Sequence, residues 1–173
     1  MQRPTPTDVE HEVTPVDMIV SKSDEEGNVT YTNPIFMKIS GYTKGELLDQ
    51  PHSILRHPDM PKVIFKYLWD NLKEGKEVHA FVKNLCKDGE FYWVLAQVRV
   101  ATNPDGSFRN YVSTRKNVLP KAKAAISALY AKLLEIEKSE GVEASEKALM
   151  AFLDENGVTP DTFNDFMHKL NEE

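Results

Sequence analysis

The sequence has little cysteine, no long apolar run and no cluster of basic residues. A single cysteine, Cys86, excludes an internal disulfide, and no Cys and His spacing typical of a zinc site occurs. No run approaches the roughly 18 apolar residues of a membrane helix, and residues 1–12 lack the order of a secretory signal. A net charge of -6 argues against nucleic acid as the main partner. These absences predict a cytoplasmic protein without direct membrane insertion, in which Cys86 is a structural thiol.

The composition is that of a folded protein of ordinary size. The chain has 173 residues, of which 40% are apolar and 28% charged, which suits one domain with an extension. Residues 1–15 carry three prolines among polar neighbours and are predicted to be a flexible N-terminal segment. Residues 16–118 read as the main domain, and residues 119–173 as a helical extension.

Extended segments rich in Val, Phe, Tyr and Trp predict a sheet. They cover residues 16–21, 29–32, 77–85, 91–102 and 107–116. Turn sequences at 87–89 and 103–106 are strong hairpin signals, so consecutive strands should be antiparallel. Strands that flank a group of helices favour an α+β fold, in which a five-stranded antiparallel sheet carries its helices on one face with a pocket between the layers.

The helices between the second and third strands have clear start signals. Asn33 and Pro34 end a strand and precede helical spacing over residues 35–39, and Thr43 is a typical N-cap for residues 44–48. A third helix is predicted over residues 62–73. Its apolar side chains recur at spacings of three and four and should face inward.

The segment 51–61 (PHSILRHPDMP) places two His, one Arg and one Asp in a turn that prolines keep from being a continuous helix. Asp59 is positioned to cap the helix that follows. Polar groups in a turn beside an aromatic helix favour the mouth of a ligand site.

Helical spacing returns after residue 119. A heptad-like seam there could form a dimer or pack onto its own domain; its members are Leu119, Ala122, Ile126, Leu129, Leu133 and Ile136. Gly141 should end that helix. Two further helices, 144–155 and 159–170, are predicted to pack together as a hairpin.

Several motifs resemble one family. They lie at residues 36–42, 51–61, 69–75, 82–84 and 87–94. Together they resemble the PAS domain of Aer-type aerotaxis receptors over residues 16–118, with the Arg-His-Pro-Asp-Met-Pro run as the most specific part. The resemblance implies a PAS fold that holds FAD noncovalently and senses redox state or cellular energy.

The resemblance also implies site residues. Those expected to bind the cofactor are Asn33, Arg56, His57, Asp59, Trp69 and Asn84. An indole such as Trp69 can pack on a flavin ring, Asn84 can supply a donor and an acceptor, and Arg56 can neutralise the pyrophosphate or the reduced ring. No Gly-rich phosphate loop occurs, so side chains and turn amides would have to hold a dinucleotide.

Residues after 118 do not resemble the receptor's linker, membrane anchor or methyl-accepting helices. The similarity is therefore to free-standing, CetB-like PAS proteins of bipartite energy-taxis systems. It implies a cytoplasmic sensor that signals through protein contact to a separate, membrane-bound chemotaxis transducer, with a homodimer as a further expectation.

Two alternatives stay open from the residues. One is a haem-binding PAS gas sensor with His52, His57 or His79 as the axial ligand. The other is a cofactor-free PAS module for dimerisation or docking, in which the tryptophans are core. A blue-light adduct sensor is disfavoured because the central turn has no cysteine, and no nucleophile and base pair indicates an enzyme.

Overall fold

The five extended segments form one antiparallel sheet, in a computed structural model that describes residues 2–172. The strands are β1 (Ile19–Ser23), β2 (Val29–Thr32), β3 (Val78–Leu85), β4 (Phe91–Thr102) and β5 (Phe108–Lys116). The helices are α1 (Pro34–Ser40), α2 (Lys44–Leu47), the 3-10 helix η1 (His52–Leu55), α3 (Lys62–Lys73), α4 (Pro120–Glu140), α5 (Val142–Glu155) and α6 (Phe163–Leu170). The predicted α+β class with a C-terminal helical extension is confirmed.

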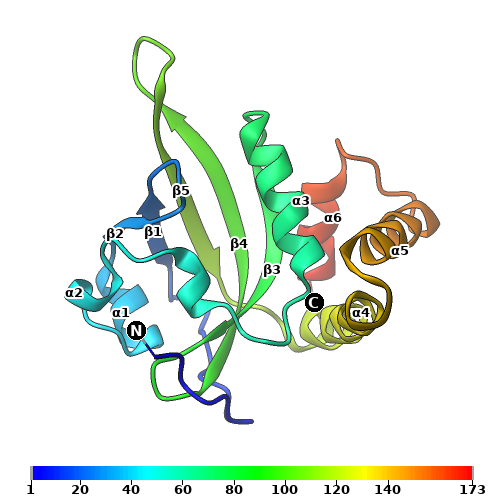
Figure 1. The fold of residues 1–173 in the computed structure, drawn as a ribbon, viewed down its shortest axis with the longest axis horizontal. Helices are drawn as coiled ribbons and strands as arrows, with labels where there is room; N and C mark the ends of the chain where they lie inside the picture. Colours follow the sequence, from blue (N-terminus) through cyan, green and yellow to red (C-terminus); the bar gives the residue numbers. More distant parts are fainter. Residues whose placement is uncertain (1, 173) are drawn as a thin grey trace.

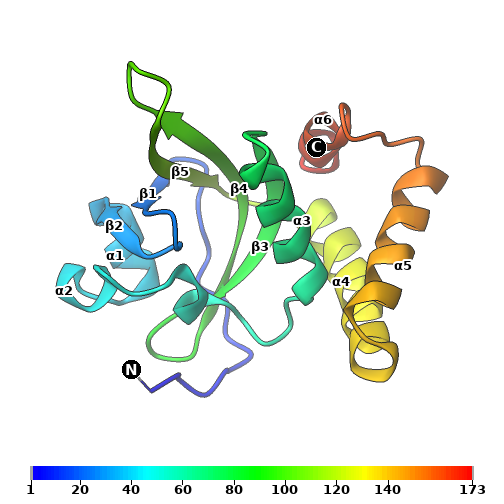
Figure 2. The ribbon, with the colours of Figure 1, turned by 45° about the horizontal axis from the view of Figure 1, so that its top comes forward.

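The strand order is β2-β1-β5-β4-β3, so the first and last parts of the main domain meet in the middle of the sheet. Every neighbouring pair is antiparallel. The helices α1, α2, η1 and α3 cover one face, and the C-terminal helices lie beyond β3, at the opposite end from α1 and α2 (Figure 1, Figure 2). The sheet therefore has one long strand edge, β3, beside the C-terminal helices.

The first strand begins three residues later than its predicted start at residue 16. Asp17 accepts hydrogen bonds from the backbone N–H and the hydroxyl of Thr14, at 2.8 and 2.9 Å. This local turn competes with extended pairing and leaves Val16 90% exposed. The start predicted from the apolar run was therefore wrong, and β1 begins at Ile19.

Side-chain caps define the two short helices, and the Thr43 cap is the one that the sequence predicted. The side chain of Asn33 accepts a hydrogen bond from the backbone N–H of Phe36, with Pro34 in the first turn of α1. Thr43 and Glu46 form a reciprocal capping box on α2. Asn33 also joins α1 to β1, because its amide oxygen accepts from the N–H of Val20 at 3.1 Å.

The predicted cap of α3 is wrong. Pro61 occupies the N-cap position without a side-chain bond, and the carboxylate of Asp59 instead pairs with Lys83 at 2.8 Å. The first amides of α3 donate to Glu137 of α4: the N–H of Lys62 to Oε2 at 2.9 Å and the N–H of Val63 to Oε1 at 2.8 Å. A carboxylate from another helix thus caps α3 and meets its positive dipole end.

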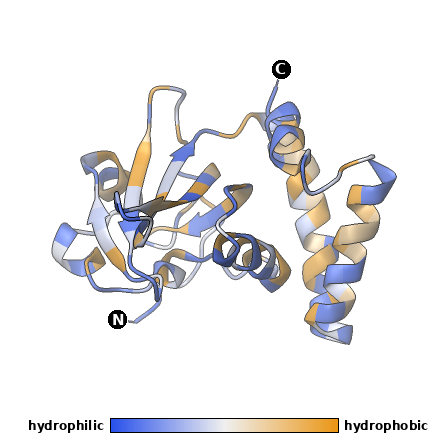
Figure 3. Ribbon diagram, turned by 90° about the horizontal axis from the view of Figure 1, so that it is seen from above, coloured by the Kyte–Doolittle hydropathy of each residue, from blue (hydrophilic) through white to orange (hydrophobic). Residues whose placement is uncertain are grey.

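Helix α4 packs on its own domain. This was one of the two predicted roles of the heptad-like seam, the other being a dimer contact. Its buried residues include Ala122, Ile126 and Leu133 of the seam. The ring of Tyr130 lies 6.1 Å from that of Trp93, on the sheet face opposite α3. Figure 3 shows apolar residues along both α4 and α5, which run side by side.

The helices α5 and α6 pack together through the rings of Phe152 and Phe166, whose centroids are 6.3 Å apart. Helix α6 begins at Phe163 rather than at residue 159, because Thr159 and Thr162 form a turn closed by side-chain and backbone hydrogen bonds. No helix within residues 2–172 is long and apolar enough to cross a bilayer.

The N-terminal segment, predicted to be flexible, has defined contacts with the sheet. The N–H of Thr7 donates to the carbonyl of Gly89 at 2.8 Å, and the N–H of His11 to the carbonyl of Phe91 at 2.7 Å. Phe91 donates back to Val9 at 3.0 Å. Residues 7–11 therefore extend the sheet beside the start of β4, at a point that β5 does not reach.

Side chains of the C-terminal helices cover the free edge of β3. Asn164 of α6 accepts from the N–H of His79 at 2.8 Å and donates to the carbonyl of Glu77 at 3.0 Å. The hydroxyl of Tyr130 donates to the carbonyl of Phe81 at 2.6 Å. An edge strand with unpaired backbone groups invites association, and here it is capped within the chain.

We expect Tyr130→Phe to lower the free energy of unfolding by about 1–2 kcal/mol, because the buried carbonyl of Phe81 loses its partner. Tyr67→Phe is the matched control, since the Tyr67 ring packs on Phe163 while its hydroxyl bonds to no described residue. Urea denaturation of both variants checks this. Equal losses would show that the Tyr130 hydroxyl contributes nothing specific.

Candidate cofactor site

A cavity of about 440 Å³ lies between the sheet and α3. Its volume is in the range of small-molecule sites, which is about 300–1,000 Å³. The elements that line it are β1, β3, β4 and β5 on one side, and η1 and α3 on the other. The lining residues are Ser23, Glu26, Gly27, Pro51, His52, Ser53, Leu55, Arg56, Phe65, Leu68, Trp69, Val82, Asn84, Ala96, Val98, Tyr111, Ser113 and Arg115.

The helix side of the cavity is aromatic. Phe65 and Trp69 lie one turn apart on α3, and both face the sheet. The ring of Trp69 meets that of Tyr111 edge to face, with centroids 5.2 Å apart. Small residues oppose them on the sheet, where Ala96 and Val98 of β4 leave room for a flat ring. The predicted inward stripe of α3 thus forms one wall of the cavity.

Arg115 of β5 places a buried positive charge in the sheet wall. The residue is 6% exposed, and its guanidinium donates to the hydroxyl of Ser21. Its Nη1 is buried without a hydrogen-bond partner among residues 2–172. The guanidinium also lies over the ring of Phe36, 4.9 Å from its centroid. Burial lowers the pKa of Arg115 to about 10, so it stays charged at neutral pH.

His52 completes this buried polar chain. Its Nε2 lies 3.1 Å from the hydroxyl of Ser21, which is itself fully buried. Burial, and next the charge of Arg115, lower the pKa of His52 to about 3. The imidazole is therefore neutral under physiological conditions, and it orients the Ser21 hydroxyl that Arg115 binds.

Arg56 carries a second unmatched guanidinium on the helix side. Its guanidinium lies 3.6 Å from the centroid of the Phe65 ring, a cation–π contact. Its Nε is buried and has no partner within the described part of the chain. Burial, and next the charge of Arg3, lower the pKa of Arg56. Two arginines thus reach the cavity with donors that the protein does not satisfy.

Asn84 lies on β3 at the inner end of the cavity, 8% exposed. An isolated antiparallel bridge to Arg56 draws the turn before α3 against this strand. The side-chain amide can offer one donor and one acceptor to the same ligand edge. Arg56, Trp69 and Asn84 are the predicted site residues that the structure brings together.

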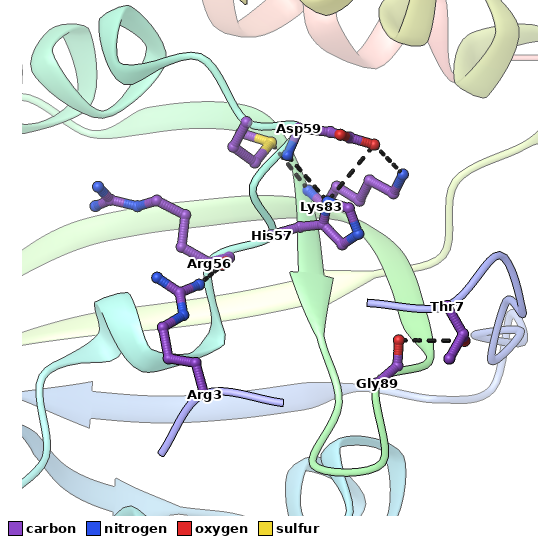
Figure 4. Close-up of polar contacts among 8 residues, drawn as sticks. Arg3, Thr7, Arg56, His57, Asp59, Lys83 and Gly89 are labelled. Carbon is purple, nitrogen blue, oxygen red and sulfur yellow. Dashed lines mark hydrogen bonds and ion pairs between the residues drawn. The ribbon is translucent and has the colours of Figure 1, made fainter. Parts of the chain in front are cut away.

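The other three predicted site residues do not line the cavity. Asn33 caps α1 and bonds to β1. His57 is buried, and its Nδ1 accepts from the N–H of Asp59 at 3.0 Å, while burial and then Lys83 lower its pKa. Asp59 is paired with Lys83 on the outer side of the turn (Figure 4). In this arrangement they shape the turn that presents Arg56.

The histidines of the haem alternative lie in three different places. His52 reaches the cavity but is held by Ser21, and His57 serves the turn. His79 lies on the other face of the sheet, where its Nδ1 is 2.7 Å from Nε2 of His168 and its Nε2 is 2.7 Å from Glu77. No described contact favours one of them as an axial ligand.

Cys86 is buried away from the cavity lining. Its thiol donates to the carbonyl of Ile39 at 3.3 Å, and burial raises its pKa to about 12. A thiol in this environment stays protonated and unreactive. This agrees with the prediction of a structural role.

Sequence reasoning missed Arg115 and Ser21. A weak signal was present, because Ser113 and Arg115 alternate with apolar or β-branched neighbours and so share one face of a strand. Which face looks into the cavity depends on pairing of β5 between β1 and β4. Without knowledge of that pairing, the sequence predicts that Arg115 is an exposed residue on a strand.

Comparisons with known proteins agree with this fold. The family described as "PAS fold" matches residues 29–115. The chain belongs to the PAS fold family. The chain is also similar to the aerotaxis receptor of Escherichia coli strain K12, which is 39% identical over 112 residues, 65% of this chain and 22% of that protein.

Other relatives are more distant. The nitrogen fixation regulatory protein of Klebsiella pneumoniae is 27% identical over 99 residues, 57% of this chain and 20% of that protein. The chain thus spans about a fifth of the length of these two relatives. A light-oxygen-voltage domain studied with a flavin analogue shares the fold, with a TM-score of 0.55 and 21% identity over 71% of this chain and 87% of that chain.

The half-buried His52, whose imidazole is desolvated, predicts a change of stability with pH. In the unfolded chain its pKa is near 6.5, whereas in the folded protein it is about 3. Between these values the unfolded state binds the extra proton, so stability is full above pH 6.5 and is lost as the pH falls. At pH 5 the loss from this group should be about 2 kcal/mol.

Denaturation midpoints of the unsubstituted chain and His52→Gln, measured between pH 5 and pH 8, check this. The difference between the two isolates His52, because other groups titrate in both proteins. We expect the variant to lose less stability on acidification. An unchanged slope would mean that His52 does not remain neutral in the folded state.

Proposed function

We propose that the protein is a redox or energy sensor that binds FAD in the cavity between α3 and the sheet. The observation that carries the proposal is the pair of buried, unsatisfied guanidinium donors, on Arg115 and Arg56, in a cavity with an aromatic wall. Buried polar groups are normally paired, so such donors are typical of a site that a ligand completes. The family resemblance and the flavin named with one similar structure support a flavin as that ligand.

The residues of the cavity suit a flavin ring. Trp69 and Phe65 offer flat apolar surface on one side, against Ala96 and Val98 on the other. Asn84 can pair with a ring edge that has both a donor and an acceptor. When bound, the flavin supplies reversible uptake of electrons and protons.

Arg115 gives this site its redox sensitivity in our proposal. Its fixed positive charge, oriented by Ser21 and His52, favours a ligand that becomes more negative. His52 stays neutral and does not compete for that negative charge. A change of charge in the cavity would therefore first alter the hydrogen bonds of Arg115 and Ser21. These residues lie on β5 and β1.

The output in this proposal is a contact with another protein rather than catalysis. Both walls of the cavity touch the C-terminal helices: Glu137 caps α3, and Tyr130 and Asn164 bond to β3. A shift of α3 or β3 would change the surface that α4 and α6 present. Similarity to the aerotaxis receptor supports a membrane-bound chemotaxis transducer as the partner, and a cytoplasmic location beside it.

The absorption spectrum of the purified protein tests the cofactor. We expect flavin bands, and FAD in the extract released by heat. A Soret band would favour the haem alternative, and a featureless visible spectrum of folded protein that cannot be loaded with flavin would favour the cofactor-free module.

Trp69→Phe should reduce flavin retention severalfold, because a smaller ring covers less of the ligand. Trp93→Phe is the matched control, since Trp93 lies on the opposite face of the sheet against Tyr130. Flavin content per folded protein measures both. Equal flavin retention in the two variants would contradict the assignment of Trp69 to the flavin site.

Arg115→Met keeps the length of the buried side chain and removes its charge. We expect the flavin midpoint potential to become more negative by about 30–60 mV, because the added negative charge loses a charged hydrogen-bond partner. Arg109→Met is the control, as Arg109 is exposed on the same strand. Spectroelectrochemical titration checks the shift, and equal potentials would contradict the role of Arg115.

Glu137→Ala should speed hydrogen exchange at the first amides of α3 severalfold, because loss of a cap costs about 1 kcal/mol. Glu135→Ala is the control on the same helix, since Glu135 is exposed and its carboxylate contacts no described amide. If redox state alters exchange in α4 of the unsubstituted protein, the Glu137 variant should lose that response. An unaltered response would exclude this route.

A further inference from the structure

The N-terminal segment brings a further cation, Arg3, to the turn that lines the cavity. The guanidinium of Arg3 donates to the backbone carbonyl of Arg56 (Figure 4). The charge of Arg3 is also close enough to lower the pKa values of Arg56 and His57. The Arg3 guanidinium thus binds the backbone of the same residue whose own guanidinium extends over the ring of Phe65.

Neither guanidinium is neutralised within the described chain. Among residues 2–172, the ion pairs closer than 4.0 Å include neither Arg3 nor Arg56, although carboxylates of Asp59 and Glu46 are paired nearby with lysines. Like charges repel, and Arg56 is in addition partly desolvated over Phe65. An arrangement that keeps two such cations together is favoured when an anion lies between them.

The position of Arg3 is built into the chain. Hydrogen bonds between residues 7–11 and the start of β4 anchor the segment, and Pro4 and Pro6 restrict the backbone between that anchor and Arg3. Gly89 permits the close approach, because its φ is +93° and an added Cβ would lie 2.2 Å from the carbonyl oxygen of Thr5. Arg3 is therefore held at the turn by its hydrogen bond to Arg56, although its side chain is exposed.

We infer that Arg3 and Arg56 together form a subsite for the diphosphate of a dinucleotide, and that Arg3 makes the cavity select a dinucleotide over a mononucleotide. Planar guanidinium forks match phosphate oxygens, and two of them match two linked phosphates. A mononucleotide carries one phosphate and would leave one cation unmatched. This inference rests on the proposed flavin site and adds the N-terminal segment to it.

Titration of the flavin-free full chain with FAD, FMN and riboflavin at fixed ionic strength tests the subsite. We expect FAD to bind about tenfold or more tightly than FMN. Arg3→Ala should remove most of that preference, by weakening FAD binding about tenfold while FMN and riboflavin change less than about twofold. Arg109→Ala, an exposed cation on β5, should leave all three affinities unchanged.

Gly89→Ala tests the same site without touching a ligand-binding side chain, because it displaces the segment that carries Arg3. A thermal melt confirms that this variant is folded. A loss confined to FAD supports the subsite. If Arg3→Ala and folded Gly89→Ala both keep the FAD preference, the inference is overturned while flavin binding stands. If the unsubstituted chain binds none of the three, the proposed function itself fails.

Discussion

The buried charge of Arg115 is the constraint on which the site depends. A guanidinium inside a sheet wall is costly to desolvate, and the chain offsets only part of that cost through the Ser21 hydroxyl and the ring of Phe36. These partners come from β1 and α1, so the charge ties the centre of the sheet to the first helix. The remaining donor, Nη1 of Arg115, has no hydrogen-bond partner among residues 2–172.

The same cavity is bounded by the two elements that the C-terminal helices hold. The carboxylate of Glu137 in α4 caps the first turn of α3. Side chains of α4 and α6 form hydrogen bonds to the free edge of β3. In many sheets an exposed edge is blunted by charges or bulges. Here hydrogen bonds from the C-terminal helices cover the edge, so two walls of the cavity are in direct contact with residues outside the main domain.

Local sequence signals predicted most of the secondary structure. The turn at Gly89, the Thr43 cap and the inward stripe of α3 are properties of short segments, and the structure confirms them. The predictions were wrong where another interaction, local or distant, competed with the predicted one. Asp59, the predicted cap, instead pairs with Lys83, a residue 24 positions away. The predicted first residues of β1 follow a turn in which the N–H of Thr14 bonds to Asp17.

The sequence by itself determined the fold class and the order of strands along the chain, and its resemblance to one family pointed to three residues of the cavity, Arg56, Trp69 and Asn84. Periodicity, turn chemistry and a specific motif act over a few residues, so they can be read without coordinates. Only the tertiary structure decided that Arg115 faces inward, that Glu137 caps a helix 74 positions earlier and that Arg3 reaches the central turn. Those contacts depend on which strands become neighbours and on how distant segments pack, and no local pattern carries that information.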